Sequence, residues 1–322
     1  MTLNEFLAEW HNDNPRILVH TSGSTGKPKP LMVEKQRMLN SARITCDFLG
    51  LKPGDTALLC MPLDYIAGKM MVVRSIERDL RLTSVRPSSH PLADDALPSF
   101  TFAAMVPMQV YHTLQQPQER ERLMRIRHLI IGGGAISDEL AQMIKPLPNA
   151  VWSTYGMTET LSHIALRRLN GPDATLWYTP FDGVGISLNA DGCLVIDAPE
   201  VCAEPLVTND IALLRTDERT GKTLFRIKGR KDNVVCSGGI KIQIEEVEET
   251  LRPHLSTPFM IVKKQDEMLG EKAILLTESA DLPLIEEICR NALPKYWVPR
   301  QFLHIDRLPL TETGKPKRSG AF

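Results

Sequence analysis

Short apolar runs alternate with helical patterns along the first half of the chain. Four runs have the length and composition of buried strands: residues 17–19, 57–60, 129–131 and 151–154. Residues 36–48 and 69–76 carry apolar side chains at helical spacing. Strands that are separated by helices predict a mostly parallel sheet with helices on its faces. Ligands of such sheets bind at the carboxyl ends of the strands.

Two helix ends have recognisable capping residues. Gly50 follows the helical pattern of residues 36–48, and a glycine just past a helix adopts the left-handed conformation without strain. Ser137 precedes a helical pattern that contains Leu140 and Ile144. Its hydroxyl is suited to accept a hydrogen bond from a free N–H of the first turn. We therefore expect Gly50 to end one helix and Ser137 to begin another.

The pattern changes near Val184, where hairpins replace the helices. Two hairpins are predicted: residues 186–188 with 193–196, and residues 210–215 with 223–228. Residues 231–322 then form a small mixed unit whose first helix covers residues 244–251. The predicted fold is α/β. It has a large N-terminal domain (residues 1–230), with a mostly parallel sheet and a β-rich hairpin region, and a small, mobile α+β C-terminal domain (residues 231–322).

Composition and charge exclude several functional classes. The 322 residues are 43% hydrophobic and 24% charged, as in an ordinary globular enzyme. The net charge of −1 removes any global electrostatic reason to expect a nucleic-acid or membrane partner. No apolar run reaches the length of a membrane helix, and the acidic first sixteen residues do not resemble a secretory signal. The six cysteines lack CxxC spacing, so we expect a reduced, cytoplasmic protein.

A loop rich in serine, threonine and glycine follows the first strand. Its predicted phosphate-binding residues are Thr21, Ser22, Gly23, Ser24, Thr25, Gly26 and Lys27. Glycines allow backbone N–H groups to approach phosphate oxygens, while the hydroxyls donate hydrogen bonds and the lysine adds positive charge. The P-loop pattern is excluded, because only two residues separate Gly23 from Gly26 and a proline follows Lys27. A solvated turn is the alternative interpretation.

Four further motifs follow this loop in a fixed order. They are residues 155–160 (YGMTET), Asp210, residues 229–232 (GRKD) and the pair Gly314–Lys315. Together with the loop they resemble the adenylate-forming superfamily, which contains acyl-CoA synthetases, firefly luciferase and peptide-synthetase adenylation domains. The resemblance extends from about Ile17 to Arg318. It implies an enzyme that activates a carboxylic acid as an acyl-adenylate and then forms a thioester.

The resemblance implies a role for each motif residue in binding ATP and Mg²⁺. The residues Thr21 to Lys27 would hold the β- and γ-phosphates. Gly132 to Ala135, with Gly133 and Gly134, would form the wall of the adenine pocket, although a tight strand-to-helix turn is the alternative interpretation. The Tyr155 ring would stack on the base, and Gly156 and Met157 would also bind ATP or AMP. Thr158 would donate a hydrogen bond to the α-phosphate, and Glu159 would hold Mg²⁺ through a carboxylate oxygen. A strand end followed by a helix cap is the alternative interpretation of residues 155–159.

The remaining motifs are expected to bind ribose and to supply a cation. By the resemblance, Asp210 accepts both ribose hydroxyls, Arg230 adds a second contact, and Asp232 is the interdomain hinge. Lys315 would stabilise the negative charge that builds on the α-phosphate during attack by the acid. Alternatively, Asp210 is an ordinary hairpin carboxylate, and Arg230, Asp232 and Lys315 are solvated surface charges.

The second step would use coenzyme A, and the acid is suggested by a local likeness. Gly238 and Gly239 match the segment that lines the pantetheine tunnel of the superfamily, although a plain turn is the alternative. Residues 62–68 (PLDYIAG) and 161–163 (LSH) resemble o-succinylbenzoate–CoA ligases of menaquinone biosynthesis. We expect Ser162, His163 and Lys69 to help receive the second carboxylate of such an acid. Otherwise His163 lies on a helix surface and Lys69 is a solvated charge.

Three departures from the superfamily pattern are visible. Longer members carry an extra subdomain before the phosphate loop, so part of the acyl or coenzyme A surface is expected to be absent or supplied by a homodimer partner. Pro30 stands where a glycine is common, and Cys236 where many members have lysine. Two other functions stay open at this stage. One is an acyl-adenylate former that passes its product to a carrier-protein thiol, and the other is a degenerate nucleotide-binding protein.

Overall fold

The computed structural model of the chain describes residues 1–20, 30–134, 136–309 and 317–318. The chain divides into two compact units. The first unit contains Met1–Ile186, Ile196–Leu206 and Arg215–Phe225. The second contains Ser187–Val195, Val207–Leu214 and Arg226–Phe322. The boundary between residues 230 and 231 stays a prediction.

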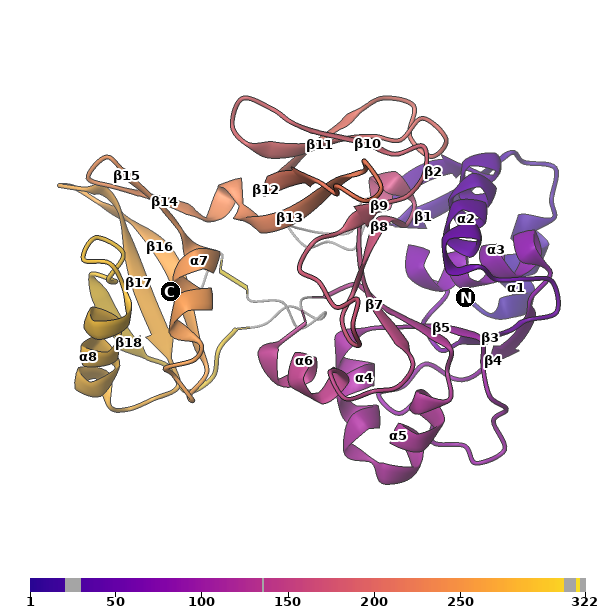
Figure 1. Cartoon of the computed structure of the whole chain (residues 1–322), viewed down its shortest axis with the longest axis horizontal. Helices are drawn as coiled ribbons and strands as arrows, with labels where there is room; N and C mark the ends of the chain where they lie inside the picture. The colour runs from indigo at the N-terminus through magenta and orange to yellow at the C-terminus, as the bar shows by residue number, and fades with distance from the viewer. Residues whose placement is uncertain (21–29, 135, 310–316, 319–322) are drawn as a thin grey trace. The chain divides into compact units, whose positions relative to one another are not determined.

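A seven-stranded sheet forms the centre of the first unit (Figure 1). Its strand order is β4-β3-β5-β6-β7-β8-β9. The strands are β3 (Thr56–Leu59), β4 (Arg81–Ser84), β5 (Phe102–Met105), β6 (His128–Ile131), β7 (Ala150–Gly156), β8 (His163–Arg168) and β9 (Thr179–Pro180). The first five in this order pair in parallel, and β8 and β9 are antiparallel. The predicted mostly parallel sheet is therefore confirmed.

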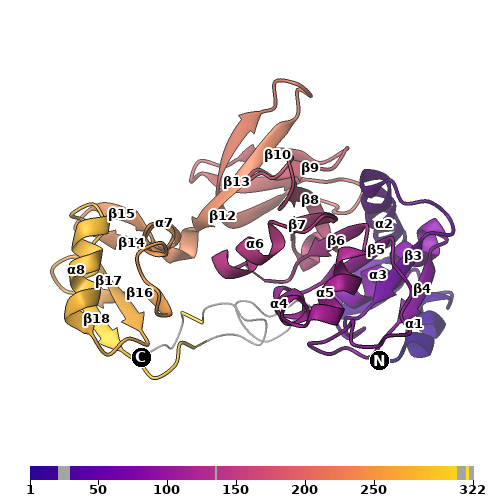
Figure 2. The same ribbon diagram turned by 60° about the horizontal axis from the view of Figure 1, so that its bottom comes forward.

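Helices cover both faces of this sheet, because its central strands are apolar on both sides. On one face, Met105, Ile131 and Val151 pack against helices α4, α5 and α6. Figures 1 and 2 show α2 and α3 on the opposite face, where Ala57 and Phe102 are also buried. The helical segments are α1 (Leu3–Trp10), α2 (Lys35–Leu49), α3 (Ile66–Arg78), α4 (Pro107–Gln115), α5 (Pro117–Met124), α6 (Asp138–Ile144) and the 3₁₀ turn η1 (Thr158–Thr160).

Both predicted helix caps are present. Gly50 follows α2 with a φ of 64°, in the left-handed region that a glycine adopts without strain. The Ser137 hydroxyl accepts a hydrogen bond from the N–H of Leu140 at 3.2 Å. These two residues delimit α2 and α6 as local chemistry predicts.

The first predicted strand does not join the parallel sheet. Strand β1 (Arg16–His20) instead pairs antiparallel with β2 (Pro30–Glu34) in a separate two-stranded sheet. Its burial alternates, with Ile17 and Val19 buried and Leu18 exposed. Such alternation is typical of a strand with one solvated face, whereas the inner strand β5 is buried at every position.

A four-stranded sheet in the order β10-β11-β12-β13 confirms the predicted β-rich hairpin region. Its strands are β10 (Gly185–Leu188), β11 (Cys193–Asp197), β12 (Leu206–Thr216) and β13 (Thr223–Arg230). The turn at residues 189–192 is closed by the Asn189 side chain, which accepts a hydrogen bond from the N–H of Asp191 at 3.0 Å. An asparagine side chain commonly stabilises a turn in this way.

The C-terminal part of the chain is a small α+β fold, as predicted (Figure 2). Its elements are η2 (Lys231–Asn233), β14 (Val234–Ser237), β15 (Ile240–Gln243), α7 (Ile244–Leu251), β16 (Phe259–Asp266), β17 (Gly270–Thr277), α8 (Leu282–Ala292) and β18 (Gln301–His304). One face of the sheet packs Ile261 and Leu275 against both helices. The other face packs Ile274 and Leu276 against the segment after β18.

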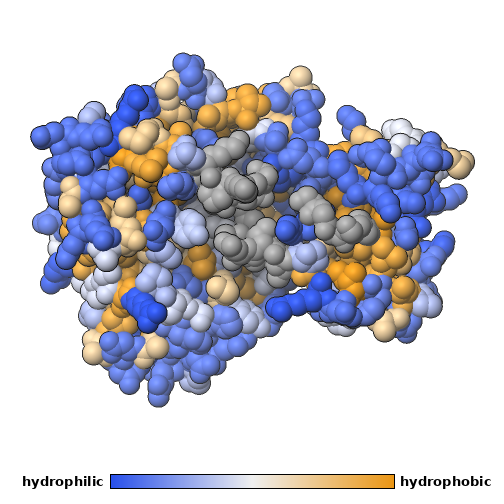
Figure 3. Space-filling model, turned by 180° about the vertical axis from the view of Figure 1, so that it is seen from behind, coloured by the Kyte–Doolittle hydropathy of each residue, from blue (hydrophilic) through white to orange (hydrophobic). Residues whose placement is uncertain are grey.

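The surface is rich in charged side chains, and the cysteines are unpaired, as the composition and the cysteine spacing predict. The face shown in Figure 3 is mostly hydrophilic, with smaller hydrophobic areas between charged side chains. All six cysteines lie within the described residues and are unpaired, and only Cys236 is exposed. No helix in the described part of the chain has the length and apolar character needed to cross a membrane.

Candidate active site

The predicted adenine-binding segments emerge at the same edge of the sheet. Gly133 and Gly134 follow β6, and Tyr155 and Gly156 end β7. These strands are parallel neighbours, with Ile131 opposite Ser153. The carboxyl ends of neighbouring parallel strands meet at one edge, which is where such sheets bind ligands.

Tyr155 is held by aromatic neighbours. Its ring lies 5.0 Å from that of Phe225 in an edge-to-face arrangement and 5.7 Å from that of Tyr178. The Tyr178 ring stacks on Phe225 at 5.3 Å. Aromatic pairs in these geometries are mutually attractive and restrict ring rotation. A half-buried, oriented ring at a strand end suits the predicted stacking on adenine.

Gly156 lies where the backbones of β7 and β8 come unusually close. A Cβ at this position would lie 2.2 Å from the carbonyl oxygen of Ser162 and 2.4 Å from Cα of His163. The register between the two strands shifts at this point. Leu161 nearby has a φ of 63°, which strains a bulky residue. Strained backbone of this kind is commonly found at functional sites.

Thr158 and Glu159 lie in the short turn η1, directly after β7. Thr158 is buried, whereas the Glu159 side chain is exposed and has no ion-pair partner among the described residues. Its backbone carbonyl accepts a hydrogen bond from the Cys202 thiol at 3.3 Å. A free carboxylate fits Mg²⁺, which prefers one or two protein carboxylates together with substrate phosphates. The described residues contain no cluster of three metal-ligating side chains, and the Mg²⁺ role of Glu159 stays a prediction.

A chain of polar side chains crosses the interior beside this turn. The Arg74 Nη2 donates to Ser162 Oγ at 2.6 Å, and Ser162 Oγ lies 3.2 Å from Nδ1 of His163. Nε2 of His163 lies 3.2 Å from Thr45 Oγ1, which donates to the carbonyl oxygen of Ser41. Each donor finds an acceptor if His163 is neutral with its proton on Nε2.

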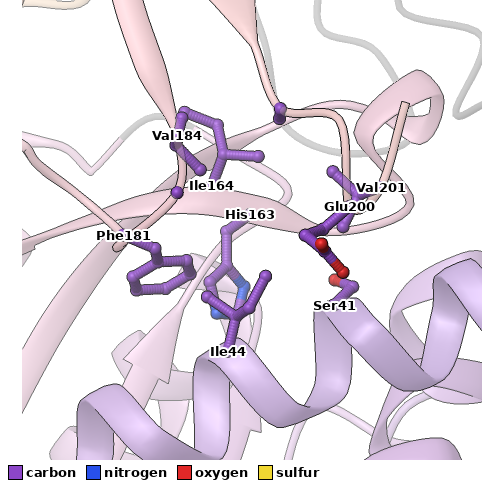
Figure 4. A pocket seen from close by; sticks show the side chains of 10 residues that line it. Ser41, Ile44, His163, Ile164, Phe181, Val184, Glu200 and Val201 are labelled. Atoms are coloured by element: carbon purple, nitrogen blue, oxygen red, sulfur yellow. The ribbon is translucent and has the colours of Figure 1, made fainter. Parts of the chain in front are cut away.

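His163 begins strand β8 and is buried, which corrects the interpretation that places it on a helix surface. Figure 4 shows its ring between helix α2, which supplies Ile44, and the Phe181 ring. The adjoining pocket has a volume of about 10 Å³, room for one water molecule. Burial, and the positive charge of Arg74, hold the pKa of His163 well below its ordinary value. A buried neutral imidazole is therefore expected at physiological pH.

Arg74 is a candidate that the sequence reasoning missed. Its side chain is 2% exposed, and burial lowers its pKa to about 10. No carboxylate within the described part of the chain pairs with it, and its Nε has no hydrogen-bond partner there. Buried charges are normally paired, so an unpaired guanidinium is unusual. The sequence feature that could have indicated a buried arginine is its position directly after the apolar run MMVV in the predicted helix.

Lys69 is buried rather than solvated. Its Nζ donates to the carbonyl oxygen of Leu18 at 2.7 Å and lies 5.8 Å from the Phe6 ring centroid. Burial lowers its pKa. These contacts connect α3 to β1 and α1, and none of the hydrogen bonds or ring contacts of Lys69 in the described part of the chain reaches Ser162 or His163. Its role toward a substrate carboxylate stays a prediction.

Asp210, Arg230 and Asp232 come together in the second unit. Arg230 lies 3.4 Å from Oδ1 of Asp210 and 2.8 Å from Oδ2 of Asp232. Burial lowers the pKa of Arg230, but the hydrogen bond to Asp232 and the two carboxylates outweigh it, so the pKa is raised. The guanidinium orients the Asp210 carboxylate on β12. The ribose role of this pair and the hinge role of Asp232 stay predictions.

Gly238 and Gly239 form the two-residue turn between β14 and β15. Their φ angles are 56° and 83°, and Ser237 pairs directly with Ile240. Two consecutive residues with positive φ are what the tightest hairpin turns require. The turn explains both glycines structurally, while their contact with coenzyme A stays a prediction.

Several predicted site residues lie outside the described residues. They are the phosphate loop from Thr21 to Lys27, Ala135 and Lys315. Met157, by contrast, is described: it caps η1, and its N–H donates to Thr160 Oγ1 at 3.0 Å.

The comparison with protein families identifies the superfamily directly. The model of the AMP-binding enzyme family matches residues 4–203. The chain belongs to the AMP-binding enzyme family. The 2-succinylbenzoate–CoA ligase of Bacillus mycoides (strain KBAB4) is similar to it, with 26% identity over 339 aligned positions. The match covers 95% of this chain and 69% of that relative.

Two solved structures extend the likeness to nearly the whole chain. An acyl-CoA synthetase (AMP-forming)/AMP-acid ligase II-like protein from Dyadobacter fermentans is 33% identical, with a TM-score of 0.68 and coverage of 98% of this chain and 91% of that one. The o-succinylbenzoate coenzyme A synthetase of Bacillus subtilis, solved with ATP and magnesium ion, has a TM-score of 0.73. At 23% identity, over 94% of this chain and 69% of that one, it shows the shared fold. These findings confirm the predicted AMP-forming ligase.

Proposed function

We propose that this enzyme is an o-succinylbenzoate–CoA ligase of menaquinone biosynthesis, which uses ATP, Mg²⁺ and coenzyme A. The observation that carries the choice of acid is the unpaired guanidinium of Arg74 behind the Ser162 hydroxyl. o-Succinylbenzoate has a second carboxylate besides the one that reacts. A buried arginine that has no carboxylate partner among the described residues would supply the positive charge that such a group requires.

Ser162 would contact this second carboxylate, and Arg74 would stabilise it from behind. The Ser162 side chain is half-buried at the rim of the polar chain, while Arg74 is enclosed. Without the acid, the Ser162 hydroxyl can donate to the neutral imidazole of His163. Because a carboxylate only accepts hydrogen bonds, the hydroxyl would turn its proton to the acid when the acid binds. The relatives named 2-succinylbenzoate–CoA ligase support the same acid.

The proposed reaction has two steps. In the first, a carboxylate oxygen of the acid attacks the α-phosphorus of ATP, and pyrophosphate leaves with the broken P–O bond. Thr158 would donate to the α-phosphate and Lys315 would stabilise its negative charge. Glu159 would hold Mg²⁺, which supplies positive charge to the phosphate oxygens. In the second step, the coenzyme A sulfur attacks the acyl carbon, AMP leaves, and the thiol proton is lost.

An acid panel with coenzyme A as the acceptor tests the assignment. Thioester formation is measured by mass with o-succinylbenzoate, benzoate and a fatty acid side by side. The highest kcat/KM is expected for o-succinylbenzoate. A preference for the fatty acid would contradict the proposed substrate, and adenylate without any coenzyme A thioester would favour transfer to a carrier protein.

An arginine variant tests whether the second carboxylate is recognised as proposed. Arg74→Met removes the charge but keeps an apolar side chain of similar length. The kcat/KM for o-succinylbenzoate should fall roughly 30-fold or more, as for loss of one partner of a buried charge pair. The kcat/KM for benzoate, which lacks the second carboxylate, should change little. Arg78→Gln, on the same helix but paired with Asp47 at the surface, is the control.

A further inference from the structure

The backbone of Arg230 is held by two neighbouring side chains. Its carbonyl oxygen accepts a hydrogen bond from Nε2 of Gln243 at 3.0 Å, and its N–H donates to Oε1 of Glu245 at 3.4 Å. The amide of Gln243 also donates to Oε2 of Glu245. Gln243 and Glu245 therefore form one hydrogen-bonded unit, which binds both polar backbone groups of Arg230.

Glu245 holds the end of the following turn as well. Its Oε1 accepts a second hydrogen bond, from Nδ2 of Asn233 at 2.5 Å. Arg230 lies directly before η2, and Asn233 is the last residue of this turn. Gln243 is 8% exposed and Glu245 is half-buried, so these hydrogen bonds have little competition from water. The turn is thus fixed at both of its ends.

A short hairpin brings the two side chains to this turn. Val234, the first residue of β14, pairs with Gln243, the last residue of β15. Glu245 follows in the first turn of α7. The hairpin therefore returns the chain to the place where Asn233 left it, and the contacts with Arg230 follow from this local pairing.

Gly229 leaves the space that these contacts require. A Cβ at this position would lie 2.4 Å from Nε2 of Gln243 and 2.5 Å from Oε2 of Glu245. A larger residue would push both side chains away from the Arg230 backbone. The glycine of the GRKD motif therefore allows the amide and the carboxylate to approach.

The guanidinium of Arg230 lies between two carboxylates. Nη1 is 3.4 Å from Oδ1 of Asp210, and Nη2 is 2.8 Å from Oδ2 of Asp232. The Arg230 side chain is 38% exposed, so the surrounding packing alone does not fix it. A fixed backbone limits the positions that the guanidinium can reach, and with them the orientation of the Asp210 carboxylate.

We propose that Gln243 and Glu245 are positioning residues for the ribose of ATP. The inference rests on the proposed function, because it takes Asp210 as the acceptor of the ribose hydroxyls and Arg230 as its partner. Gln243 and Glu245 act through Arg230: they fix its backbone, and its guanidinium orients Asp210. An acceptor that is already oriented needs less ordering when the ribose binds.

Gln243→Leu tests this role, because leucine is similar in size and removes the hydrogen bonds of the amide. Isothermal titration calorimetry gives the Kd of ATP, of 2′-deoxy-ATP and of 3′-deoxy-ATP. The wild type should prefer ATP. This preference, taken as a ratio of Kd values, should fall roughly 10-fold in Gln243→Leu, as for loss of a hydrogen bond to a charged group. A partly unfolded sample changes the number of sites but leaves this ratio unchanged.

Two further variants test the order of the contacts. Glu245→Gln keeps the shape of the side chain but sets an NH₂ group against that of Gln243, so the preference for ATP should fall as well. On an Asp210→Ala background, Gln243→Leu should produce no further loss of preference, because the acceptor through which it acts is gone.

Each substitution has a matched control. Gln265→Leu replaces an exposed glutamine on β16. Glu249→Gln replaces an exposed glutamate on α7, whose partner is Arg226. Both controls should keep the wild-type preference for ATP. Circular dichroism at the assay temperature verifies that each variant is folded.

The outcomes distinguish the inference from the function on which it rests. The positioning role would be overturned by an unchanged preference in Gln243→Leu, by equal weakening of all three nucleotides, or by a full further loss on the Asp210→Ala background. A wild type that binds the deoxy nucleotides as tightly as ATP would also overturn it, while acid activation would stand. Absence of pyrophosphate release with every acid would overturn the proposed function, whereas nucleotide binding would still test the inference.

Discussion

The side chains of Arg74, Ser162 and His163 divide charge and hydrogen bonding among themselves. Arg74 carries the positive charge and donates to the Ser162 hydroxyl, which lies within hydrogen-bond distance of His163. His163 stays neutral because burial and the neighbouring guanidinium both disfavour its protonation. A second cation at His163 would repel Arg74. The neutral histidine therefore leaves Arg74 as the single positive group of this chain of contacts.

The neutral state of His163 has a measurable pH dependence. Its pKa is lowered in the folded state from an ordinary value of 6.5, so only the unfolded chain gains this proton as the pH falls below 6.5. Stability should decrease by about 1.4 kcal/mol between pH 7.5 and 5.5 through this group alone. Urea unfolding of His163→Gln, followed by tryptophan fluorescence, should lack this part of the loss.

The control for this measurement is His11→Gln, at an exposed position after α1. It is expected to keep the pH dependence of the wild type. An identical pH dependence in the wild type and in His163→Gln would contradict the neutral buried state.

Single residues were predictable where their role is local. Gly50 and Ser137 cap helices as predicted, because backbone conformation and nearby N–H groups determine these roles. For Gly238 and Gly239 the turn was the alternative interpretation, and their contact with coenzyme A stays a prediction. Arg74 was not predicted, since an arginine in a helical pattern resembles a solvated charge until the packing around it is known.

At the scale of elements, the close backbone approach between the paired strands β7 and β8 at Gly156 shapes the site. The pairing register of the two strands shifts between Tyr155 and Gly156, and the turn η1 lies in the connection between them. This arrangement places Thr158 inside and Glu159 outside within two residues. If β7 and β8 paired regularly beyond Gly156, Thr158 and Glu159 would lie in a strand, and no turn would separate their side chains.

An added methyl group tests the close approach at Gly156. In Gly156→Ala, the Cβ would meet backbone atoms of Ser162 and His163, which cannot rotate away. We expect a loss of about 1–3 kcal/mol in the free energy of unfolding. Gly185→Ala is the control, because its Cβ would make ordinary contact with Asp197 at 3.4 Å. If the two variants had equal free energies of unfolding in urea, the close backbone approach at Gly156 would be contradicted.

The hydrophobic pattern predicted the helices and strands that have a clear period, and it missed shorter elements. The helix of residues 36–48 was found almost to its ends as α2, because its apolar spacing is regular. The strand β5 and helices α4 and α5 were not predicted, since a four-residue apolar run has no period of its own. Strand β1 was predicted, but its partner was not.

At the scale of the whole molecule, the proposed chemistry uses residues from both compact units. Tyr155, Thr158 and Glu159 belong to the first unit, whereas Asp210 and Arg230 belong to the second. The resemblance implies that the C-terminal domain changes orientation between the two steps. A cation that serves only the first orientation should then matter only for adenylation.

Lys315→Ala tests this division. Loss of one preorganised charge contact should slow adenylation by roughly 10²–10³-fold. Thioester formation from supplied acyl-adenylate should be largely unaffected, because that step is expected to use the other orientation. Lys317→Ala, an exposed lysine two residues later, is the control and should leave both steps intact. Equal loss of both half-reactions in Lys315→Ala would count against the catalytic role.

The sequence by itself determined the fold class, the helix caps, the hairpin region and the family. Each follows from local periodicity or from short motifs in a fixed order, which need no knowledge of distant contacts. The tertiary structure alone decided that His163 is a buried strand residue, that Lys69 is enclosed, and that Arg74 lies against Ser162 with no carboxylate partner in the described part of the chain. It also decided that Arg318 pairs with Glu248. The physical reason is that burial and pairing depend on residues far apart in the chain, and their contacts exist only once the sheets and helices have packed.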